Sequence, residues 1–381
     1  MIYFDNAATT KEFDEVIEKT KDISENFFAN SSSLHYLGFK AEKEIEKART
    51  MISDEILNCK YNNLIFTSGA TEANNTAINS LVFSNNVDSE ILYSKNDHPS
   101  LVRPIERLKI LGYKIIPIPS EKRGILSLNF IKKKLNKNTR LIAITHVNSV
   151  NGIIQPINKI SKIISDFRNS IPNNRLLFLI DAVQGYLKCL GKNSLGNIDL
   201  SEIDFFSVSA HKINGPKGVG FLYAKNHNKI TPLLLGGGQE NDKRSGSSPT
   251  PLILGFAKAV EIKKKYTDFQ HIISLSNFLS KKIIALNNEI KIIENKNISP
   301  YIRTLIVPKY PAEVLVHMLE KMNIFVSSGS ACSSKSQGIS PAYTALGLTN
   351  KEAKSAIRIS FSDKNTFDEI DFFVKNLSSI I

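Results

Sequence analysis

A lysine placed directly after an apolar run is the first residue here that could do chemistry. Lys212 follows residues 204–208 in the segment Ser209-Ala210-His211-Lys212. Burying an ammonium group without a partner is costly. A lysine with a lowered pKa is, however, what Schiff-base chemistry with an aldehyde cofactor needs. Taken alone, Lys212 is equally a lysine that leaves a sheet for solvent, and that simpler interpretation is favoured.

An acid and an amide stand in a comparable place. Asp181 follows the apolar run 176–180, and Gln184 comes three positions later. A carboxylate there can keep a pyridinium nitrogen protonated, which makes the ring an electron sink. Gln184 could donate to the phenolic oxygen of the same ring. Helix capping explains Asp181 equally well.

Two short turns offer a phosphate cradle and an imidazole. Residues 68–72 read Ser-Gly-Ala-Thr-Glu between a predicted strand and a predicted helix, where backbone N–H groups beside a hydroxyl can bind phosphate. Thr71 could instead be a plain helix cap. His98, in Asp97-His98-Pro99-Ser100, can stack on a flat heterocycle and move protons near neutral pH. Its alternative is a capping or surface histidine.

A thiol and a guanidinium complete the set. Small residues surround Cys332 in the segment 327–334, which predicts an exposed, flexible loop. Such a thiol suits a nucleophile that must reach a substrate and then present its cargo elsewhere. Arg358, in the predicted strand 356–361, could clamp a substrate carboxylate through two parallel hydrogen bonds. Cys59 and Cys189 are interpreted as structural or incidental.

Each of these features has an ordinary structural explanation, but they occur together. They supply a Schiff-base lysine, a pyridinium partner, a phosphate cradle, a stacking imidazole, a carboxylate clamp and a thiol. The combination predicts chemistry on an amino acid through pyridoxal phosphate.

The elements that must position these residues alternate between strand and helix. Apolar runs that suit a sheet buried on both faces occur at 64–67, 90–93, 114–117, 141–146, 176–180, 205–208 and 219–223. Amphipathic helical patterns follow several of them, at 71–82, 99–111 and 157–167. This alternation predicts an α/β fold with a mostly parallel sheet covered by helices. The last two strands, joined by the glycine-rich segment 215–220, predict one antiparallel hairpin.

The pattern changes after residues 236–238. Long helical stretches at 252–265 and 272–286 precede two short strands, 302–307 and 356–361, which bracket a helix at 312–322. We therefore expect a smaller C-terminal α+β domain. The predicted division is an N-terminal segment, 1–15, packing with the small domain, a large cofactor-binding domain, 16–256, and a small domain, 257–381, that carries Cys332.

Composition limits the class of protein. The 381 residues are 42% hydrophobic and 22% charged, as in ordinary globular domains, and the net charge of +13 favours acidic partners. The basic residues lie in scattered short runs, so direct nucleic-acid binding is not expected. No signal peptide and no membrane-spanning run is visible. Three widely spaced cysteines predict no disulfide framework and no structural metal site, and a reducing cytoplasm is expected.

The order and spacing of the motifs resemble the cysteine desulfurases, in the class V aminotransferase group of fold-type-I pyridoxal-phosphate enzymes. The resemblance spans nearly the whole chain, from YFDNAATT (3–10) to SAIRIS (355–360). Between them come NSSSLH (30–35), SGATEANN (68–75), the His98 turn, HVN (146–148), DAVQ (181–184), SAHKINGPKG (209–218), GGGQE (236–240) and SSGSAC (327–332).

The resemblance implies a role for each matching residue. Lys212 would bind the cofactor aldehyde, Asp181 would pair with the pyridine nitrogen, and Gln184 would contact the ring oxygen. His98 would stack on the ring and assist proton transfer. The phosphate would be held by Ala70, Thr71, Ser209 and His211, and by Ser247 of a second subunit. Asn148 would contact both cofactor and substrate, and with Arg358 it would orient the substrate carboxylate. Cys332 would accept the sulfur.

The implied activity is removal of sulfur from L-cysteine, giving L-alanine and a persulfide on Cys332. A homodimer is implied, with a sulfur-acceptor protein serving iron–sulfur cluster assembly or tRNA thiolation. A selenocysteine lyase, a sulfide-releasing lyase, an aminotransferase or a non-catalytic scaffold of the same fold are the alternatives. The chain departs from the family at Val150, where an acidic residue is usual, and at Ser247, where threonine is usual.

Overall fold

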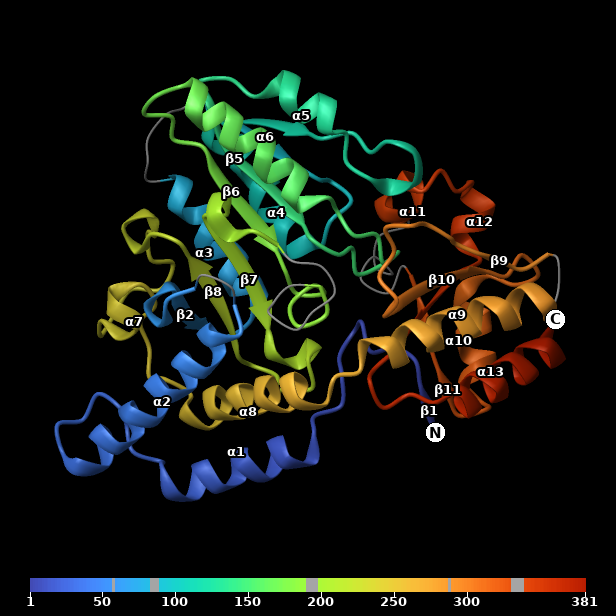
Figure 1. Cartoon of the computed structure of the whole chain (residues 1–381), viewed down its shortest axis with the longest axis horizontal. Coiled ribbons are helices and arrows are strands. Elements are labelled where there is room, and N and C mark those ends of the chain that lie inside the picture. Colours follow the sequence, from blue (N-terminus) through green and yellow to red (C-terminus); the bar gives the residue numbers. More distant parts are fainter. Residues whose placement is uncertain (57–58, 83–88, 190–197, 287–288, 330–338) are drawn as a thin grey trace.

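A computed structural model describes residues 1–56, 59–82, 89–189, 198–286, 289–329 and 339–381. The chain forms a large lobe around one sheet and a smaller lobe that holds both termini (Figure 1). The helices are α1 Asp14–Asn26, α2 Tyr36–Asp54, α3 Ala70–Val82, α4 Pro99–Arg107, α5 Leu128–Lys134, α6 Ile157–Ser170, α7 Gln239–Asp242, α8 Thr250–Tyr266, α9 Phe269–Leu286, α10 Ala312–Glu320, α11 Pro341–Ala345, α12 Asn350–Lys354 and α13 Phe367–Ile380. The strands are β1 Ile2–Tyr3, β2 Leu64–Thr67, β3 Glu90–Tyr93, β4 Lys114–Pro117, β5 Thr139–Thr145, β6 Leu177–Asp181, β7 Phe205–Ser209, β8 Gly220–Ala224, β9 Lys291–Ile292, β10 Ile302–Ile306, β11 Ile324–Phe325, β12 Ser327–Ser328 and β13 Ala356–Ser360.

The sheet of the large lobe has seven strands in the order β2-β8-β7-β6-β5-β3-β4. Its neighbours are parallel except at β8, which runs antiparallel to both β2 and β7. The predicted mostly parallel sheet with one antiparallel hairpin is thereby confirmed. Parallel strands share one carboxyl edge, and ligands of such sheets bind at that edge.

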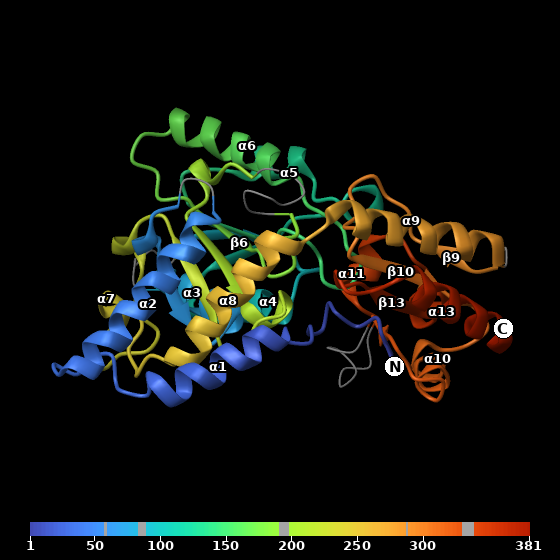
Figure 2. The ribbon, with the colours of Figure 1, turned by 60° about the horizontal axis from the view of Figure 1, so that its bottom comes forward.

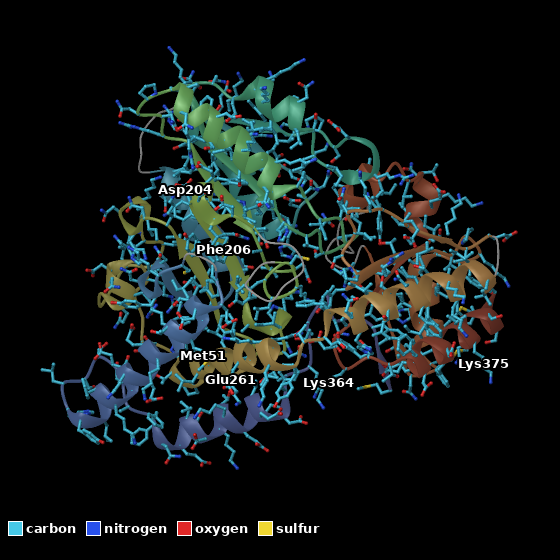
Figure 3. All side chains as sticks on the ribbon, viewed as in Figure 1. Met51, Asp204, Phe206, Glu261, Lys364 and Lys375 are labelled. Carbon is cyan, nitrogen blue, oxygen red and sulfur yellow. The ribbon has the colours of Figure 1, made fainter. Side chains whose placement is uncertain are left out.

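Helices cover both faces of this sheet, because alternate strand residues point to opposite sides. Phe66 on one face shares a core with residues of α2, α5, α6 and α8. Ile65 on the other face shares a core with residues of α3 and α4. Phe206 lies inside the large lobe (Figure 3), where its ring stacks on Tyr223 with centroids 4.6 Å apart.

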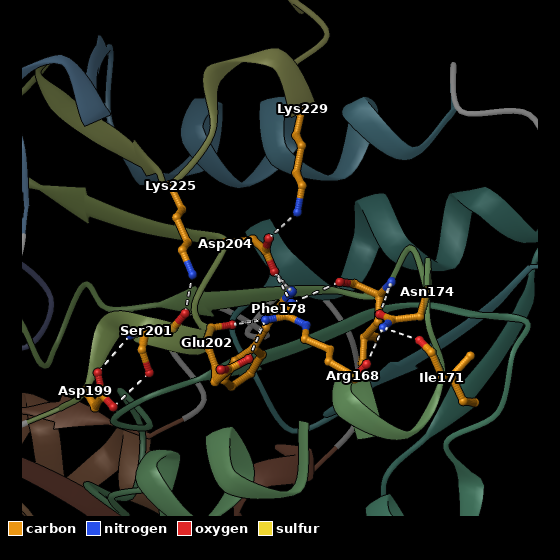
Figure 4. A network of polar contacts seen from close by, with 11 residues as sticks. Arg168, Ile171, Asn174, Phe178, Asp199, Ser201, Glu202, Asp204, Lys225 and Lys229 are labelled. Atoms are coloured by element: carbon orange, nitrogen blue, oxygen red, sulfur yellow. Dashed lines mark hydrogen bonds and ion pairs between the residues drawn. The ribbon is translucent and has the colours of Figure 1, made fainter. Parts of the chain in front are cut away.

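A polar network ties α6 to the amino ends of β6 and β7 (Figure 4). The carboxylate of Asp204 accepts from the backbone N–H of Phe178 at 2.9 Å and from Lys229 Nζ at 2.6 Å, and it also pairs with Arg168. Arg168 donates to the Leu176 carbonyl at 2.9 Å. The network anchors the end of the sheet opposite to the carboxyl edge.

The small lobe is built on an antiparallel sheet in the order β12-β13-β10-β9, covered by α9, α10 and α13. The N-terminus joins this lobe, because β1 pairs in parallel with β11 and Phe4 lies in the same core. The predicted domain limit at residue 256 falls inside α8, which packs against α1 and α2 before the chain enters α9 of the small lobe (Figure 2). Within the described ranges, no helix is long and apolar enough to cross a bilayer.

Candidate active site

The carboxyl ends of three neighbouring strands carry the residues from which the site is built. Thr145 at the end of β5 is in register with Asp181 at the end of β6, and Asp181 is in register with Ser207 of β7. Ser209 ends β7, and a single 3₁₀ turn, Ala210–Lys212, follows. The parallel register therefore brings Asp181 and the Ser209–Lys212 segment to one edge of the sheet.

Lys212 and Gln184 meet on one carbonyl oxygen of the N-terminal segment. Lys212 Nζ donates to the Ala7 oxygen at 2.8 Å and to the Ala8 oxygen at 2.6 Å. Gln184 Nε2 donates to the same Ala7 oxygen at 2.8 Å. The predicted cofactor lysine and the predicted ring-oxygen partner thus converge on one point.

Asp181 is buried, and both of its carboxylate oxygens are held. Oδ1 accepts from the backbone N–H of Val183 at 3.1 Å, and Oδ2 accepts from Asn74 Nδ2 at 3.0 Å. The first of these bonds resembles a cap, which was the alternative interpretation of Asp181. The second comes from a buried helix residue and fixes the direction of the carboxylate.

The N-terminus of α3 lies against the end of β7. The backbone N–H of Ala70 donates to Ser209 Oγ at 2.8 Å, and Thr71 beside it is exposed. Gly220 allows this approach, because a Cβ there would lie 2.2 Å from the Val208 oxygen and 2.8 Å from Gly69 Cα. The hydroxyl of Ser209 and the first amide groups of α3 therefore meet at one corner of the site, and groups of this kind can bind an anion.

His211 borders this corner beside the N-terminal segment. Its Nδ1 lies 3.1 Å from Thr9 Oγ1. Burial, together with the nearby charges of Lys212, Lys217 and Lys188, lowers the pKa of His211 to about 4. The ring is therefore neutral at physiological pH, and it can donate one hydrogen bond to an anion.

His98 is the N-cap of α4 and keeps part of its surface exposed. Its Nδ1 accepts from the backbone N–H of Ser100 at 3.1 Å. The surrounding protein lowers the pKa of His98 by burial, while Asp181 raises it and Lys212 lowers it. The two charges place His98 in the same site, and its capping bond leaves the exposed ring able to stack on a planar group.

The predicted carboxylate clamp is occupied by the protein itself. Arg358 Nη2 lies 2.5 Å from Asp5 Oδ1, and its Nη1 donates to the Ser149 oxygen at 2.8 Å. Arg358 Nε is buried and has no partner among the described residues. Asn148 Nδ2 donates to the Asn96 oxygen at 2.9 Å. A substrate carboxylate would have to replace Asp5 as the partner of Arg358.

The structure shows the surroundings of the two residues that depart from the family pattern, Val150 and Ser247. Val150, at the position where an acid is usual, packs on a small apolar cluster with Ile306 and Tyr343. Ser247 is exposed and follows Gly246, whose φ is 120°. Its loop is anchored to α3, because Arg244 Nε lies 2.8 Å from Glu72 Oε1.

Cys332, the predicted sulfur acceptor, lies outside the described residues. The strand β12, Ser327–Ser328, which precedes it, is in register with Arg358 and Ile357 of β13. The chain therefore enters the segment of Cys332 directly beside the clamp arginine.

Asp5, Ala7 and Asn74 are among the residues of the site that received no role from the sequence. Asp5 and Ala7 hold Arg358 and Lys212, although they lie in a motif that supported only the family resemblance. Asn74 bonds to Asp181 from α3. Asn74 is a polar residue on the buried side of that helix, beside Ala73, Ala77 and Ile78. This unusual position was the signal by which the sequence could have indicated a role for Asn74.

A cavity of about 620 Å³ opens elsewhere, between the start of α6 and α9. Its lining includes Ile157, Ser276 and Arg303, and none of the predicted site residues. Arg303 donates to Ser276 and Ser280, both at 2.9 Å. We assign the chemistry to the carboxyl edge of the large sheet, because the titratable groups converge there.

Comparisons with known proteins agree with this arrangement. Residues 2–373 match the model of the aminotransferase class-V family. Cysteine desulfurase IscS 1 of Archaeoglobus fulgidus is 35% identical over all of this chain and 97% of that protein. A solved NifS-like protein superposes with a TM-score of 0.89 at 30% identity, covering 100% of this chain and 98% of that chain. A solved structure described as SspA in complex with cysteine has a TM-score of 0.81 at 31% identity, covering 96% of this chain and 100% of that chain. The chain belongs to the aminotransferase class-V family and, within it, to the cysteine desulfurases.

Proposed function

We propose that this protein uses pyridoxal phosphate to take the sulfur from L-cysteine onto Cys332, releasing L-alanine. The convergence of Lys212 and Gln184 on the Ala7 oxygen, beside the buried carboxylate of Asp181, carries the proposal. Membership in the cysteine desulfurases supports it. L-Cysteine as substrate is further supported by the cysteine bound in the structure described as SspA.

The residues present fit the cofactor. Lys212 is the amine that would hold the aldehyde, and Asp181 is the buried carboxylate that would pair with a ring nitrogen. The corner formed by Ala70, Thr71, Ser209 and the neutral His211 would hold the phosphate. Gly220 lets the turn before α3 approach β7, because a Cβ there would collide with Gly69 and with the Val208 oxygen. Bound there, pyridoxal phosphate withdraws electrons from the α-carbon of an attached amino acid.

The protein's own residues orient the substrate and move protons. Arg358 would exchange Asp5 for the substrate carboxylate, and Asn148 would support that carboxylate from the neighbouring loop. Both groups are buried, so the exchange replaces one charge-assisted bond with another and leaves no unpaired cation. His98, with one ring nitrogen bound to Ser100, would carry a proton at the other.

Cys332 performs the sulfur transfer. As a thiolate it attacks the sulfur of the substrate, and the C–S bond breaks with its electron pair moving to carbon. A proton then completes L-alanine, and the transferred sulfur remains on Cys332 as a persulfide. The described residues supply orientation, because Arg358 comes from β13 of the small lobe and Lys212 from the turn after β7 of the large sheet.

A second copy of the chain is part of the proposal. Phe28, Leu34 and Phe39 in the α1–α2 region are exposed, as is Leu235. Residues of 31–49 and 237–248 line one pocket of about 230 Å³, so the two apolar segments and the loop of Ser247 are neighbours. Exposed apolar surface of this kind marks an interface, and Ser247 would complete the phosphate site of the partner.

The sulfur would pass to an acceptor protein for iron–sulfur assembly or tRNA thiolation. The net charge of +13 favours an acidic acceptor. A reducing cytoplasm would keep the thiol of Cys332 free for catalysis. The functional division is proposed as residues 1–15, 16–256 and 257–381, with the Cys332 segment carried by the last.

The test compares the cofactor-loaded wild type with Cys332→Ala and Lys212→Ala, with L-cysteine and a reductant. We expect wild type to release alanine and sulfide. Cys332→Ala should keep the visible cofactor band and lose at least about a hundredfold in turnover, because the nucleophile is gone. Lys212→Ala should lose the band that depends on its amine.

Equal turnover by Cys332→Ala would contradict transfer through that thiol. A sulfide-releasing or selenocysteine lyase, or an aminotransferase, would then be the better assignment. Assays with selenocysteine and with a keto-acid acceptor separate these alternatives. A wild type without any cofactor band would indicate the non-catalytic scaffold.

A further inference from the structure

A chain of hydrogen bonds runs from the ring of His98 to Asp181. Ser100 Oγ lies 2.8 Å from His98 Nδ1, the nitrogen that also accepts from the Ser100 backbone N–H. Asn74 Nδ2 lies 3.1 Å from Ser100 Oγ and 3.0 Å from Asp181 Oδ2. Asn74 and Ser100 are buried. We call these two residues the Asn74–Ser100 link.

The chemistry of the groups sets the direction of every bond in the link. A carboxylate only accepts, so the Asn74 amide nitrogen faces Asp181 and its second hydrogen goes to Ser100 Oγ. The Ser100 hydroxyl then has its own hydrogen left for His98 Nδ1. The Ser100 backbone N–H can only donate. His98 Nδ1 therefore accepts twice, and the hydrogen of the neutral ring sits on Nε2.

We propose that Asn74 and Ser100 are positioning residues that hold His98 with its hydrogen on Nε2, so that the ring offers a proton before it can accept one. The proposal rests on the proposed function and deepens it. Asp181 would hold the cofactor nitrogen on one side and, through the link, fix the proton of His98 on the other.

The surroundings agree with a neutral ring. A cationic His98 would need a hydrogen on Nδ1, directed at the Ser100 N–H. Burial lowers the pKa of His98, with Lys212 acting in the same direction and Asp181 opposing. Asp97, the adjacent acid, bonds to the Thr145 N–H at 2.6 Å and to Ser94 Oγ at 2.9 Å. Asn74 Oδ1 is buried without a partner among the described residues. Turning the amide would bring that oxygen against the carboxylate of Asp181.

Asn74→Asp keeps the shape of the side chain but reverses the direction of its hydrogen bond to Ser100. An aspartate at position 74, ionised or protonated, presents an acceptor to Ser100, so the hydroxyl turns away from His98. The serine oxygen then faces Nδ1 and favours a hydrogen there. In the cofactor-loaded enzyme we expect the acid limb of the kcat/KM profile for alanine formation to move up by about one pH unit, a tenfold change in proton affinity.

A new carboxylate would also attract a proton to His98 through space, and Ser100→Ala separates the two effects. We expect most of the shift to be lost in Asn74→Asp/Ser100→Ala, because the hydroxyl that transmits it is gone and only the through-space effect of the carboxylate remains. Asn79→Asp, the same change on another side of α3, should leave the profile at its wild-type position. Asp97 and Lys212 are present in all of these variants, so a shift that arose from either of them would persist in the double variant. A shift of equal size in the single and double variants would overturn the link.

A spectroscopic readout needs no turnover. Full-length, cofactor-loaded protein labelled with ¹⁵N-histidine, with His98→Gln to assign the signals, reports which ring nitrogen carries hydrogen. We expect Nε2–H in wild type and a hydrogen on Nδ1 in Asn74→Asp. A wild-type signal with hydrogen on Nδ1 overturns the proposal. If wild type makes no alanine, the proposed desulfurase function fails, while this spectrum still decides the link.

Discussion

At the residue scale, the site depends on buried polar groups whose partners are inside the protein. Asp97, which precedes His98, is one example, because its carboxylate accepts from the Thr145 N–H at 2.6 Å and from Ser94 Oγ at 2.9 Å. The pKa of Asp97 is raised to about 7, chiefly by burial and in part by the charge of Asp181, while its hydrogen bonds to Thr145 and Ser94 act in the opposite direction. Asp97 is therefore an acid whose protonation changes across the physiological range while its neighbours stay in place.

The stability of the cofactor-free protein should report this titration. The folded protein holds the Asp97 proton more tightly than the unfolded chain does, because the pKa rises from 3.8 to about 7. The contribution of Asp97 to the free energy of unfolding is complete below the lower value and is lost as pH rises through the upper one. As pH rises between these two values, the free energy of unfolding of the wild type should fall by a few kcal/mol because of Asp97. Asp97→Asn should not show this fall. Urea unfolding of both proteins from acid to neutral pH measures it, and parallel curves would contradict the assignment.

At the element scale, strands and helices are held at one end of the sheet so that the other end can carry the site. The Asp204 network joins α6, β6 and β7 at their amino side, where Arg168 and Lys229 share one carboxylate (Figure 4). The Asp204 side chain is 4% exposed, so solvent cannot replace it as a partner. The carboxyl side of the same strands holds Asp181 and Ser209.

Removing the carboxylate should weaken the fold and spare the site. We expect Asp204→Asn to lower the free energy of unfolding by about 2–4 kcal/mol, because Arg168 and Lys229 lose a buried negative charge and one of the two acceptor oxygens becomes a donor. Asp199→Asn, which alters an exposed acid bonded to Ser201, should cost less than about 1 kcal/mol. Denaturant unfolding measures both. An unchanged stability in Asp204→Asn, or an altered cofactor spectrum in the folded variant, would contradict this division between the two ends.

At the scale of the whole molecule, the two lobes and the proposed second copy would together complete the site. The N-terminal segment is part of the small-lobe core at Phe4, yet it reaches Lys212 through Ala7 and Ala8. The exposed apolar side chains near α2 and the exposed Ser247 lie on neighbouring segments of the large lobe. The proposed dimer would thus cover apolar surface and close the phosphate corner in one step.

We expect the wild type to have twice the mass of one chain in solution. Leu34→Asp/Phe39→Asp should halve that mass and weaken cofactor binding at least about tenfold, because charge in the interface separates the copies and removes Ser247. Phe372→Asp, at an exposed apolar residue on α13, is the control and should change neither property. Light scattering measures the mass in solution, and cofactor titration measures the affinity for the cofactor. A monomeric wild type with full cofactor affinity would contradict the dimer.

The sequence alone determined the large sheet, its parallel character and the residues that end its strands. Apolar runs such as 205–208 and 176–180 are local signals, and they placed Lys212 and Asp181 correctly within the fold. Local pattern also predicted the small lobe. The boundary at residue 256 was placed inside α8, since helical periodicity continues through a change of lobe.

Only the tertiary structure decided which distant groups meet. Asp5 on Arg358, Ala7 on Lys212 and Asn74 on Asp181 are contacts between segments about 100 to 350 residues apart. Periodicity reports which face of an element is buried, but it carries no information about the partner of a particular atom. The direction of the bonds through Asn74 and Ser100 depends on such partners, because a hydrogen bond is assigned by what stands at its far end. The residue types indicated the chemistry, and the packing of distant segments determined the geometry of the site.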